Sequence, residues 1–186
     1  MPMSSVQDGF NNMSYQPSPL VERAWQQHPR CLAEIDATPM TTPPEGMDAF
    51  DDQGFFSVAC RCGCKRMKLI GHPHPEAGML CPLDVECVGC FRQVPLFDVA
   101  EHGYDAELGH GCYSMRAIGQ RGDFACEQCA GVSFELFVSF SYQIEPIEDW
   151  PQEDQVRIQN LFDGFGVDAR CNGCGVLAAP VSYECA

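Results

Sequence analysis

Thirteen of the 186 residues are cysteines, and eight of them group into four close pairs. Each pair lies in a tight turn and is followed within a few residues by a β-prone segment, as in CVGCFRQVPLFD and CEQCAGVSFELFV. Two sulfurs two or three residues apart at a turn point to the same side, where backbone amides can hydrogen-bond their thiolates. Two such turns that face each other therefore form a tetrahedral cage of four sulfurs around one metal ion.

The order of the pairs along the chain predicts which of them share a metal ion. We expect the first two pairs to form one site and the last two to form another: Cys60, Cys62, Cys87 and Cys90 in the first, and Cys126, Cys129, Cys171 and Cys174 in the second. The first site is less regular because CRCGC offers three sulfurs for two positions. We favour Cys60 and Cys62 because Gly63 then follows the second ligand, where the turn needs a positive φ. Cys64 remains an alternative to either.

The segments ECVGC, CEQC and CNGCG resemble the knuckles of the zinc-ribbon, or rubredoxin-like, superfamily, over roughly residues 57–97 and 124–186. The tandem arrangement is similar to that of bacterial zinc-ribbon proteins. The resemblance implies β-hairpins that hold one metal ion between two knuckles, and it implies no activity. Zinc is the metal expected at two sites of four thiolates each. Rubredoxin-type iron, which would transfer one electron, is the alternative.

Prolines and the near absence of aliphatic periodicity set residues 1–54 apart from the rest of the chain. We expect an N-terminal arm there with one short helix in SPLVERAWQQH, where Ser18 can cap the helix and Pro19 suits its first position. Residues 55–115 and 116–186 should each form one zinc-ribbon unit. The predicted fold is therefore a β-rich α+β protein with two four-cysteine sites, short helices and an N-terminal arm.

Two segments of the second unit carry clear local signals. SFELFVSFSYQI alternates Phe134, Leu136, Val138 and Phe140 with mostly polar residues, a pattern typical of a half-buried strand. WPQEDQVRIQNLFDGFG favours a helix with Pro151 near its start and acidic residues in its first turn. Phe165 belongs to its predicted apolar face, and Gly164 and Gly166 mark its end.

The chain has 26 acidic and 11 basic side chains and a formal net charge of −15. Affinity for nucleic acid comes mainly from Lys and Arg, so this balance disfavours a general nucleic-acid binder and favours a basic partner. No run of about 18 apolar residues could span a membrane. The N-terminus also lacks the basic start and apolar stretch of a secretion signal, so we expect a cytoplasmic protein whose cysteines bind metal rather than form disulfides.

Two acidic segments are candidate partner-binding surfaces. HGYDAELGHG is a distinctive loop sequence, and residues 122–156 contain acidic but no basic side chains, with several acids around a tryptophan. Acids around an aromatic anchor suit docking on a cationic protein. The residues predicted to bind the partner are Tyr104, Asp105, Glu107, Glu145, Glu148, Asp149, Trp150, Glu153 and Asp154.

We expect no catalysis, because a four-thiolate site has no open coordination position and no nucleophile–base set is evident. The leading hypothesis is a protein that binds and inhibits a basic partner, in its most specific form an immunity protein that neutralises a bacterial toxin. The alternative is a nucleic-acid or transcription-associated zinc-ribbon module that uses Arg61, Lys65, Arg66 and Lys68. A third metal site formed by His72, His74 and His110 also stays open.

Overall fold

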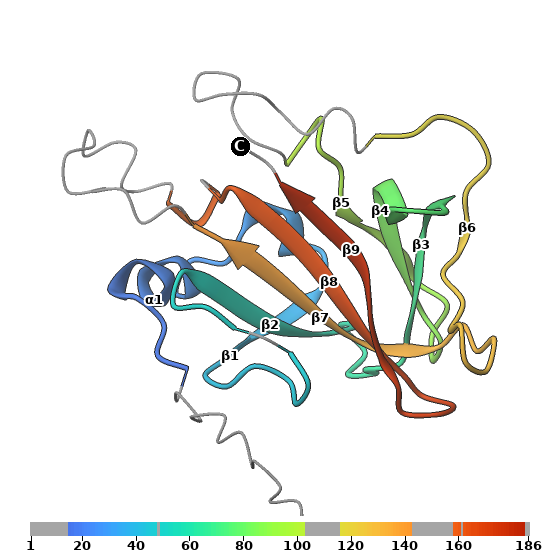
Figure 1. Ribbon diagram of the computed structural model, residues 1–186, viewed down its shortest axis with the longest axis horizontal. Coiled ribbons are helices and arrows are strands. Elements are labelled where there is room, and N and C mark those ends of the chain that lie inside the picture. The colour runs from blue at the N-terminus through green and yellow to red at the C-terminus, as the bar shows by residue number, and fades with distance from the viewer. Residues whose placement is uncertain (1–14, 48, 103–115, 143–157, 161, 185–186) are drawn as a thin grey trace, which may run out of the picture.

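A computed structural model describes residues 15–47, 49–102, 116–142, 158–160 and 162–184 (Figure 1). One α-helix, two short 3-10 helices and nine strands follow in this order: α1 Pro19–Trp25, 3-10 Arg30–Leu32, β1 Asp36–Met40, β2 Gln53–Ala59, β3 Met67–His74, β4 Gly78–Cys87, β5 Gln93–Phe97, β6 Gly122–Asp123, β7 Phe134–Ser141, 3-10 Ile158–Asn160, β8 Gly164–Cys171 and β9 Leu177–Glu184. The described residues are thus mostly β, as the sequence predicted.

All nine strands belong to one antiparallel sheet, in which β7 occupies the centre. One edge of β7 pairs with β8 over its whole length, and β8 in turn pairs with β9. The other edge pairs with β2 and, at Phe134, with Met67 of β3. From there the sheet continues through β4 to β5, while β1 extends it beyond β2. Strands from residues 55–115 and 116–186 are therefore joined in a single sheet through β7.

The sheet curls so that its two halves enclose the core. Tyr183 of β9 donates a buried hydrogen bond of 2.7 Å to the carbonyl oxygen of Met79 on β4. Next to this bond, Gly78 has a φ of +70°, and a Cβ there would collide with the Pro180 carbonyl oxygen, so this approach requires glycine. Deeper in the curl, Phe97 of β5 stacks on Phe165 of β8 with ring centroids 3.9 Å apart.

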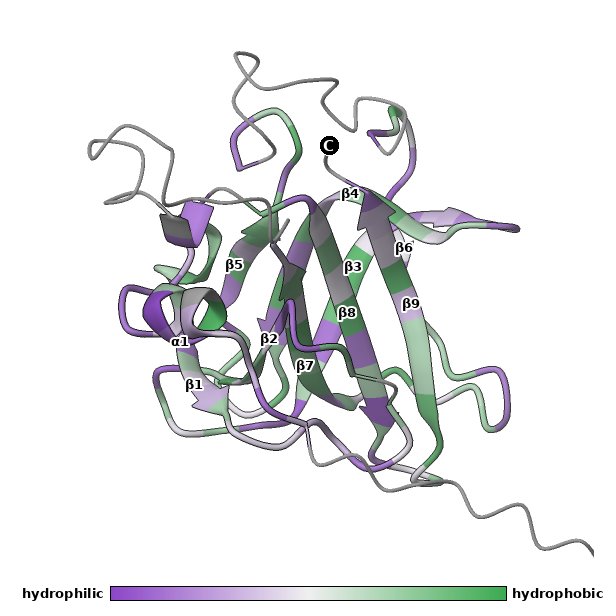
Figure 2. Cartoon of the chain, turned by 60° about the vertical axis from the view of Figure 1, so that its left-hand side comes forward, coloured by the Kyte–Doolittle hydropathy of each residue, from purple (hydrophilic) through white to green (hydrophobic). Residues whose placement is uncertain are grey.

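Burial along β7 follows the alternation that the sequence predicted. Its apolar positions are buried, whereas Ser139 and Ser141 on the other face are half-buried. Phe137 is the exception, because it belongs to the outer face yet is only 4% exposed. The Arg170 guanidinium lies over its ring, 5.5 Å from the centroid. Figure 2 shows the same alternation of hydrophobic and hydrophilic residues along the neighbouring strand β8.

The predicted N-terminal helix is confirmed as α1. Ser18 caps it by accepting a hydrogen bond of 3.3 Å from the backbone N–H of Val21, and Pro19 occupies its first position. Val21 is fully buried, and the helix packs on β2 at Gly54, where a Cβ would lie 2.7 Å from the indole nitrogen of Trp25. The rest of the predicted arm contributes β1 to the sheet.

The prediction of a second helix is wrong in its C-terminal part. Residues 151–157 lie outside the described residues, Ile158–Asn160 form a 3-10 turn, and Gly164–Cys171 form β8. Phe165, predicted on the helix face, is a strand residue. The cause is pairing with a distant segment, since the Asp163 N–H donates to the Ser141 carbonyl and the ladder with β7 starts at Gly164. Within the described residues, no helix has the length and apolar character that crossing a membrane requires.

Candidate metal sites

Two groups of four cysteines each have all their sulfurs within 4.8 Å of one another. They are the two groups that the sequence predicted, here called site A (Cys60, Cys62, Cys87 and Cys90) and site B (Cys126, Cys129, Cys171 and Cys174). The closest sulfur pairs lie 3.5 and 3.6 Å apart in site A, and 3.4 and 3.6 Å apart in site B. Tetrahedral coordination with metal–sulfur bonds near 2.3 Å would space the sulfurs by about 3.8 Å. Each group could therefore hold one metal ion.

The strand ends position both sites. In each site, the second knuckle is the turn of an antiparallel hairpin: Cys87 ends β4 before β5, and Cys171 ends β8 before β9. The first knuckle of site A follows β2, and that of site B precedes β7. Each site thus joins a hairpin tip to a knuckle from elsewhere in the chain.

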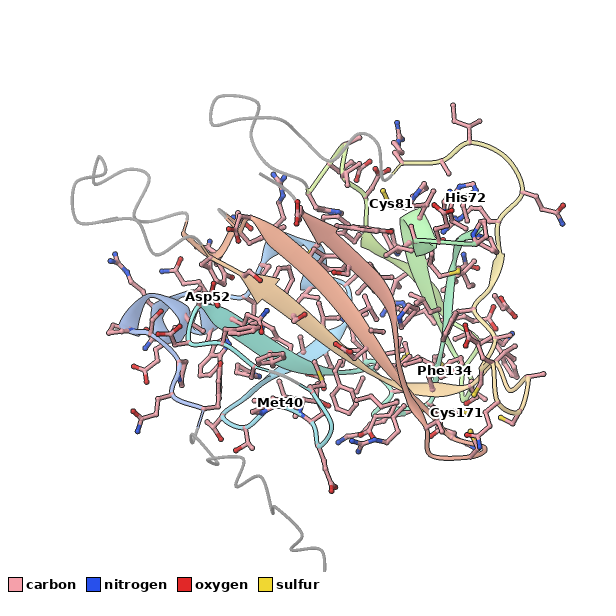
Figure 3. All side chains as sticks on the ribbon, in the orientation of Figure 1. Met40, Asp52, His72, Cys81, Phe134 and Cys171 are labelled. Atoms are coloured by element: carbon pink, nitrogen blue, oxygen red, sulfur yellow. The ribbon has the colours of Figure 1, made fainter. Side chains whose placement is uncertain are left out.

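Both sites lie at the same end of the sheet. The register places Cys87, Met67, Phe134 and Cys171 side by side on β4, β3, β7 and β8. Figure 3 shows Phe134 and Cys171 next to each other at this end. Three strand spacings separate Cys87 from Cys171, or about 14 Å between their Cα atoms.

A shared backbone turn forms all four knuckles. In each one, the residue after the second cysteine has a positive φ and donates its N–H to the carbonyl oxygen of the first cysteine. These residues are Gly63 (φ +82°), Phe91 (+60°), Ala130 (+56°) and Gly175 (+78°). The expected role of Gly63 is confirmed, and the CxC knuckle is a version of the same turn that is shorter by one residue.

Cys64, which the sequence left as an alternative ligand, does not belong to site A. Its sulfur packs against Gly89 and donates a weak hydrogen bond of 3.7 Å to the Arg66 carbonyl oxygen. The four sulfurs that converge are those of the favoured set, with Cys60 and Cys62 from the first knuckle.

Hydrogen bonds from backbone N–H groups lower the pKa of two of these cysteines, one in each site. The N–H groups of Cys174 and Gly173 lower the pKa of Cys171 to about 6. Burial raises the pKa of Cys87, but the N–H groups of Cys90 and Gly89 outweigh it and lower that pKa below its usual value. A thiolate at these positions suits metal binding, because a cysteine binds metal in its deprotonated form.

Cys129, whose sulfur lies 3.4 Å from that of Cys171, keeps its proton more tightly. Although the Gly131 N–H lowers the pKa of Cys129, hydrogen bonds with the sulfurs of Cys171 and Cys174 raise it to about 12. Without a metal ion, Cys129 is therefore the proton donor of the pair that it forms with Cys171. With one bound, every position of a tetrahedral shell is filled by the chain, and none is left for a substrate.

Several other residues singled out in the sequence lie outside the described residues. These are Tyr104, Asp105, Glu107, His110, Glu145, Glu148, Asp149, Trp150, Glu153 and Asp154. Of the remaining histidines, His72 is buried on β3, and the His74 imidazole accepts hydrogen bonds from the Glu76 and Ala77 N–H groups. Among the residues described, no third group of metal-ligating side chains converges.

Two of the four cations proposed to contact nucleic acid are already engaged within the chain. Lys68 pairs with Glu86 at 2.7 Å and lies 3.8 Å from Asp123. Arg61 donates to the Ala33 carbonyl oxygen at 2.7 Å. Lys65 and Arg66 are exposed beside site A.

No family model, curated protein or solved structure matches this chain. The likeness to zinc ribbons therefore rests on the cysteine spacing and on the geometry of the two sites.

Proposed function

We propose that this chain is a non-catalytic protein-binding module, in which two structural zinc ions hold one end of the sheet and an acidic surface binds a basic protein. The observation that carries the proposal is the complete set of four sulfurs in each site. A metal ion enclosed by four thiolates contributes to folding and does no chemistry on a substrate. The function then lies on the surface, and the charge of −15 makes that surface acidic.

Zinc fits these sites as the metal, and the two hairpin-tip knuckles support zinc-ribbon-type units. By analogy with zinc-finger peptides, each ion would contribute on the order of 10 kcal/mol to folding. Iron would fit the same sulfurs and would make the chain an electron carrier. The two metals are distinguished by colour, because the oxidised iron form is red and the zinc form is colourless.

Within the described residues, ion pairs engage only some of the carboxylates. Among the described residues, five ion pairs use the carboxylates of Glu34, Asp84, Glu86, Asp98 and Asp123. A surplus of carboxylates attracts a cationic protein and speeds its association. An inhibitor that occludes the basic active site of a toxin enzyme, as an immunity protein does, is the most specific form of this proposal.

Native mass spectrometry of the protein, purified from its own host without chelator, tests the proposal directly. We expect two zinc ions and a retained basic protein. Retained nucleic acid would favour the alternative module, and iron in place of zinc would favour electron transfer. As a matched pair, Cys62→Ser should lose one zinc ion, whereas Cys64→Ser should keep both.

The kinetics of partner binding give a second test. Steered association depends on long-range charge, which salt screens within about 10 Å at 0.1 M. We expect the association rate constant to fall tenfold or more between 20 mM and 500 mM salt. A rate that does not change with salt would contradict the proposed acidic surface.

A further inference from the structure

A hollow runs along the outer face of the sheet, where β8 carries glycines at two outward positions. Phe165 and Val167 point into the core, so Gly164 and Gly166 face outward. On β7, the hydroxyl oxygens of Ser141 and Ser139 lean over them and would lie 3.0 and 2.5 Å from a Cβ at Gly164 and Gly166. Larger side chains therefore do not fit at these two positions, and β8 leaves the face unfilled there.

Two adjoining cavities of about 410 and 310 Å³ make up this hollow. They share Gln53, Ser139, Gly166 and Ser182, so together they form one groove over β2, β7, β8 and β9. Asp163 lines one cavity and Asp168 the other. From Gly164 to Asp168 the groove follows β8 for about 13 Å, the length of four extended residues.

The groove is acidic, and the described residues do not neutralise it. One carboxylate oxygen of Asp163 is buried with no hydrogen-bond partner among these residues, and so is one of Asp52, which lines neither cavity but lies close enough for its charge to act on Asp163. Neither side chain forms an ion pair within that part of the chain, and nor does Asp168. Figure 3 places Asp52 at the end of the sheet opposite Cys171, away from both metal sites.

Burial and neighbouring negative charges both raise pKa values in the groove. Burial raises the pKa of Asp168 to about 6. Burial also raises the pKa of Asp163, and the negative charges of Asp52 and Glu184 raise it further. Arg170 follows on the same face of β8, but its guanidinium lies over the Phe137 ring and donates to the Glu45 carbonyl oxygen at 3.5 Å.

We propose that this groove binds an extended segment of a basic protein, with lysine or arginine side chains placed against Asp163 and Asp168. The inference rests on the proposed function and names the groove as the surface that binds the basic partner. Serine hydroxyls line both cavities, and Met47 and Phe55 add an apolar part to the second, so the groove suits a cationic chain whose basic side chains have long aliphatic stems. A divalent cation fits less well, because the groove carboxylates do not converge as ligands of one ion do.

The test uses a fluorescein-labelled decapeptide of alternating arginine and glycine, titrated with the metal-loaded full chain and followed by fluorescence anisotropy. We expect the double variant Asp163→Asn/Asp168→Asn to bind the peptide at least tenfold more weakly than wild type. The matched control Asp36→Asn/Glu76→Gln removes the same charge from two exposed positions elsewhere and should change the affinity less than threefold. Equal losses in both double variants would overturn the groove as the binding surface.

A third variant blocks the groove without changing its charge. Ser182 is exposed and lines both cavities, so Ser182→Trp should fill the groove and weaken peptide binding at least fivefold. Unchanged binding by this variant would contradict the proposal. Displacement of the peptide by 1 mM calcium would also contradict the proposal if this displacement required Asp163, because the groove would then be a cation site.

Partner capture separates the groove proposal from the proposed function. If Asp163→Asn/Asp168→Asn retains a basic host protein as well as wild type does, the groove proposal fails and the proposed function stands. If wild type retains no basic protein while the peptide still binds at Asp163 and Asp168, the proposed function fails and the groove remains a site for cationic chains.

Discussion

At the scale of single residues, the position after the second cysteine of each knuckle is under conformational strain in two of the four turns. Gly63 and Gly175 adopt positive φ freely, whereas Phe91 and Ala130 carry a Cβ into the same region. A non-glycine residue there costs about 1–2 kcal/mol. Glycine also gains freedom in the unfolded chain, which offsets part of that difference.

Reciprocal substitutions in site B should therefore have opposite effects on stability. We expect Ala130→Gly to raise the free energy of unfolding of the metal-loaded protein by up to about 1 kcal/mol, and Gly175→Ala to lower it by about 1 kcal/mol. No atom outside its immediate neighbours lies within 4 Å of a Cβ built at Gly175, so crowding adds nothing to its effect. Chemical denaturation at a buffered zinc concentration measures both changes. Effects of the same sign would show that the turn geometry is not the cause.

Asp168 provides a prediction about pH. Its pKa of about 6 lies above the ordinary aspartate value near 3.9, so the folded protein binds this proton more tightly than the unfolded chain does. The negative charge of Asp168 therefore lowers the free energy of unfolding. This loss is negligible below about pH 4 and grows as the pH rises through 6. Asp168→Asn should be more stable than wild type at pH 7.5, and the difference should shrink towards pH 5.

Two measurements check this expectation. A ¹³C NMR titration of the carboxyl carbon should give a midpoint near 6, and denaturation curves at pH 7.5 and pH 5 should give the stability difference. Asp36→Asn, at an exposed position on β1, is the matched control for the loss of one carboxylate. A midpoint near 4 would contradict the claim that burial raises the pKa of Asp168.

At the scale of secondary-structure elements, the contact between β5 and β8 holds the curled sheet closed. Phe165 stacks on Phe97 with an interplanar angle of 10° and also contacts Phe140 and Tyr183. We expect Phe165→Ala to lower the free energy of unfolding by about 3–5 kcal/mol, and Phe165→Leu to lower it less. Phe50→Ala, at a side chain 63% exposed, should change it by less than about 0.5 kcal/mol. Similar small effects at both positions would mean that β8 does not pack across the curl.

Elements defined by local signals were predictable from the sequence, and those defined by distant partners were not. The eight ligands follow from spacing within each turn, α1 from its cap at Ser18, and β7 from alternation. The start of β8 was misread because Gly164 and Gly166 look like a helix end. Glycine is needed at both positions because Ser141 and Ser139 of β7 approach them closely. The local sequence does not reveal this contact.

Two other strands and the acidic groove were missed for the same reason. β4 alternates apolar and polar residues only in part, and β1 lies in the proline-rich residues 1–54, where the sequence predicted an arm with one short helix. Asp52 and Asp163 are far apart in the chain and are brought near each other by the pairing of β2 and β8 with β7. Carboxylates from separate strands carry no sequence motif, whereas a cysteine knuckle does.

At the scale of the whole molecule, the two metal sites belong to one sheet rather than to independent hairpins. The row from Cys87 through Met67 and Phe134 to Cys171 connects them through directly paired strands. Loss of metal at one site should release strand ends that help to position the other. Metal binding at the two sites is therefore expected to be coupled.

This coupling can be measured with variants that each disable one site. We expect Cys87→Ser to weaken zinc binding at site B at least tenfold, measured by competition with a chromophoric chelator under reducing conditions. Because coupling free energies are reciprocal, Cys171→Ser should weaken binding at site A by a similar factor. Cys64→Ser, whose sulfur lies beside site A without joining it, is the control and should leave both affinities unchanged. If each remaining site kept its full affinity, each four-sulfur cage would fold by itself, as separate zinc-ribbon units do, and the shared sheet would not couple them.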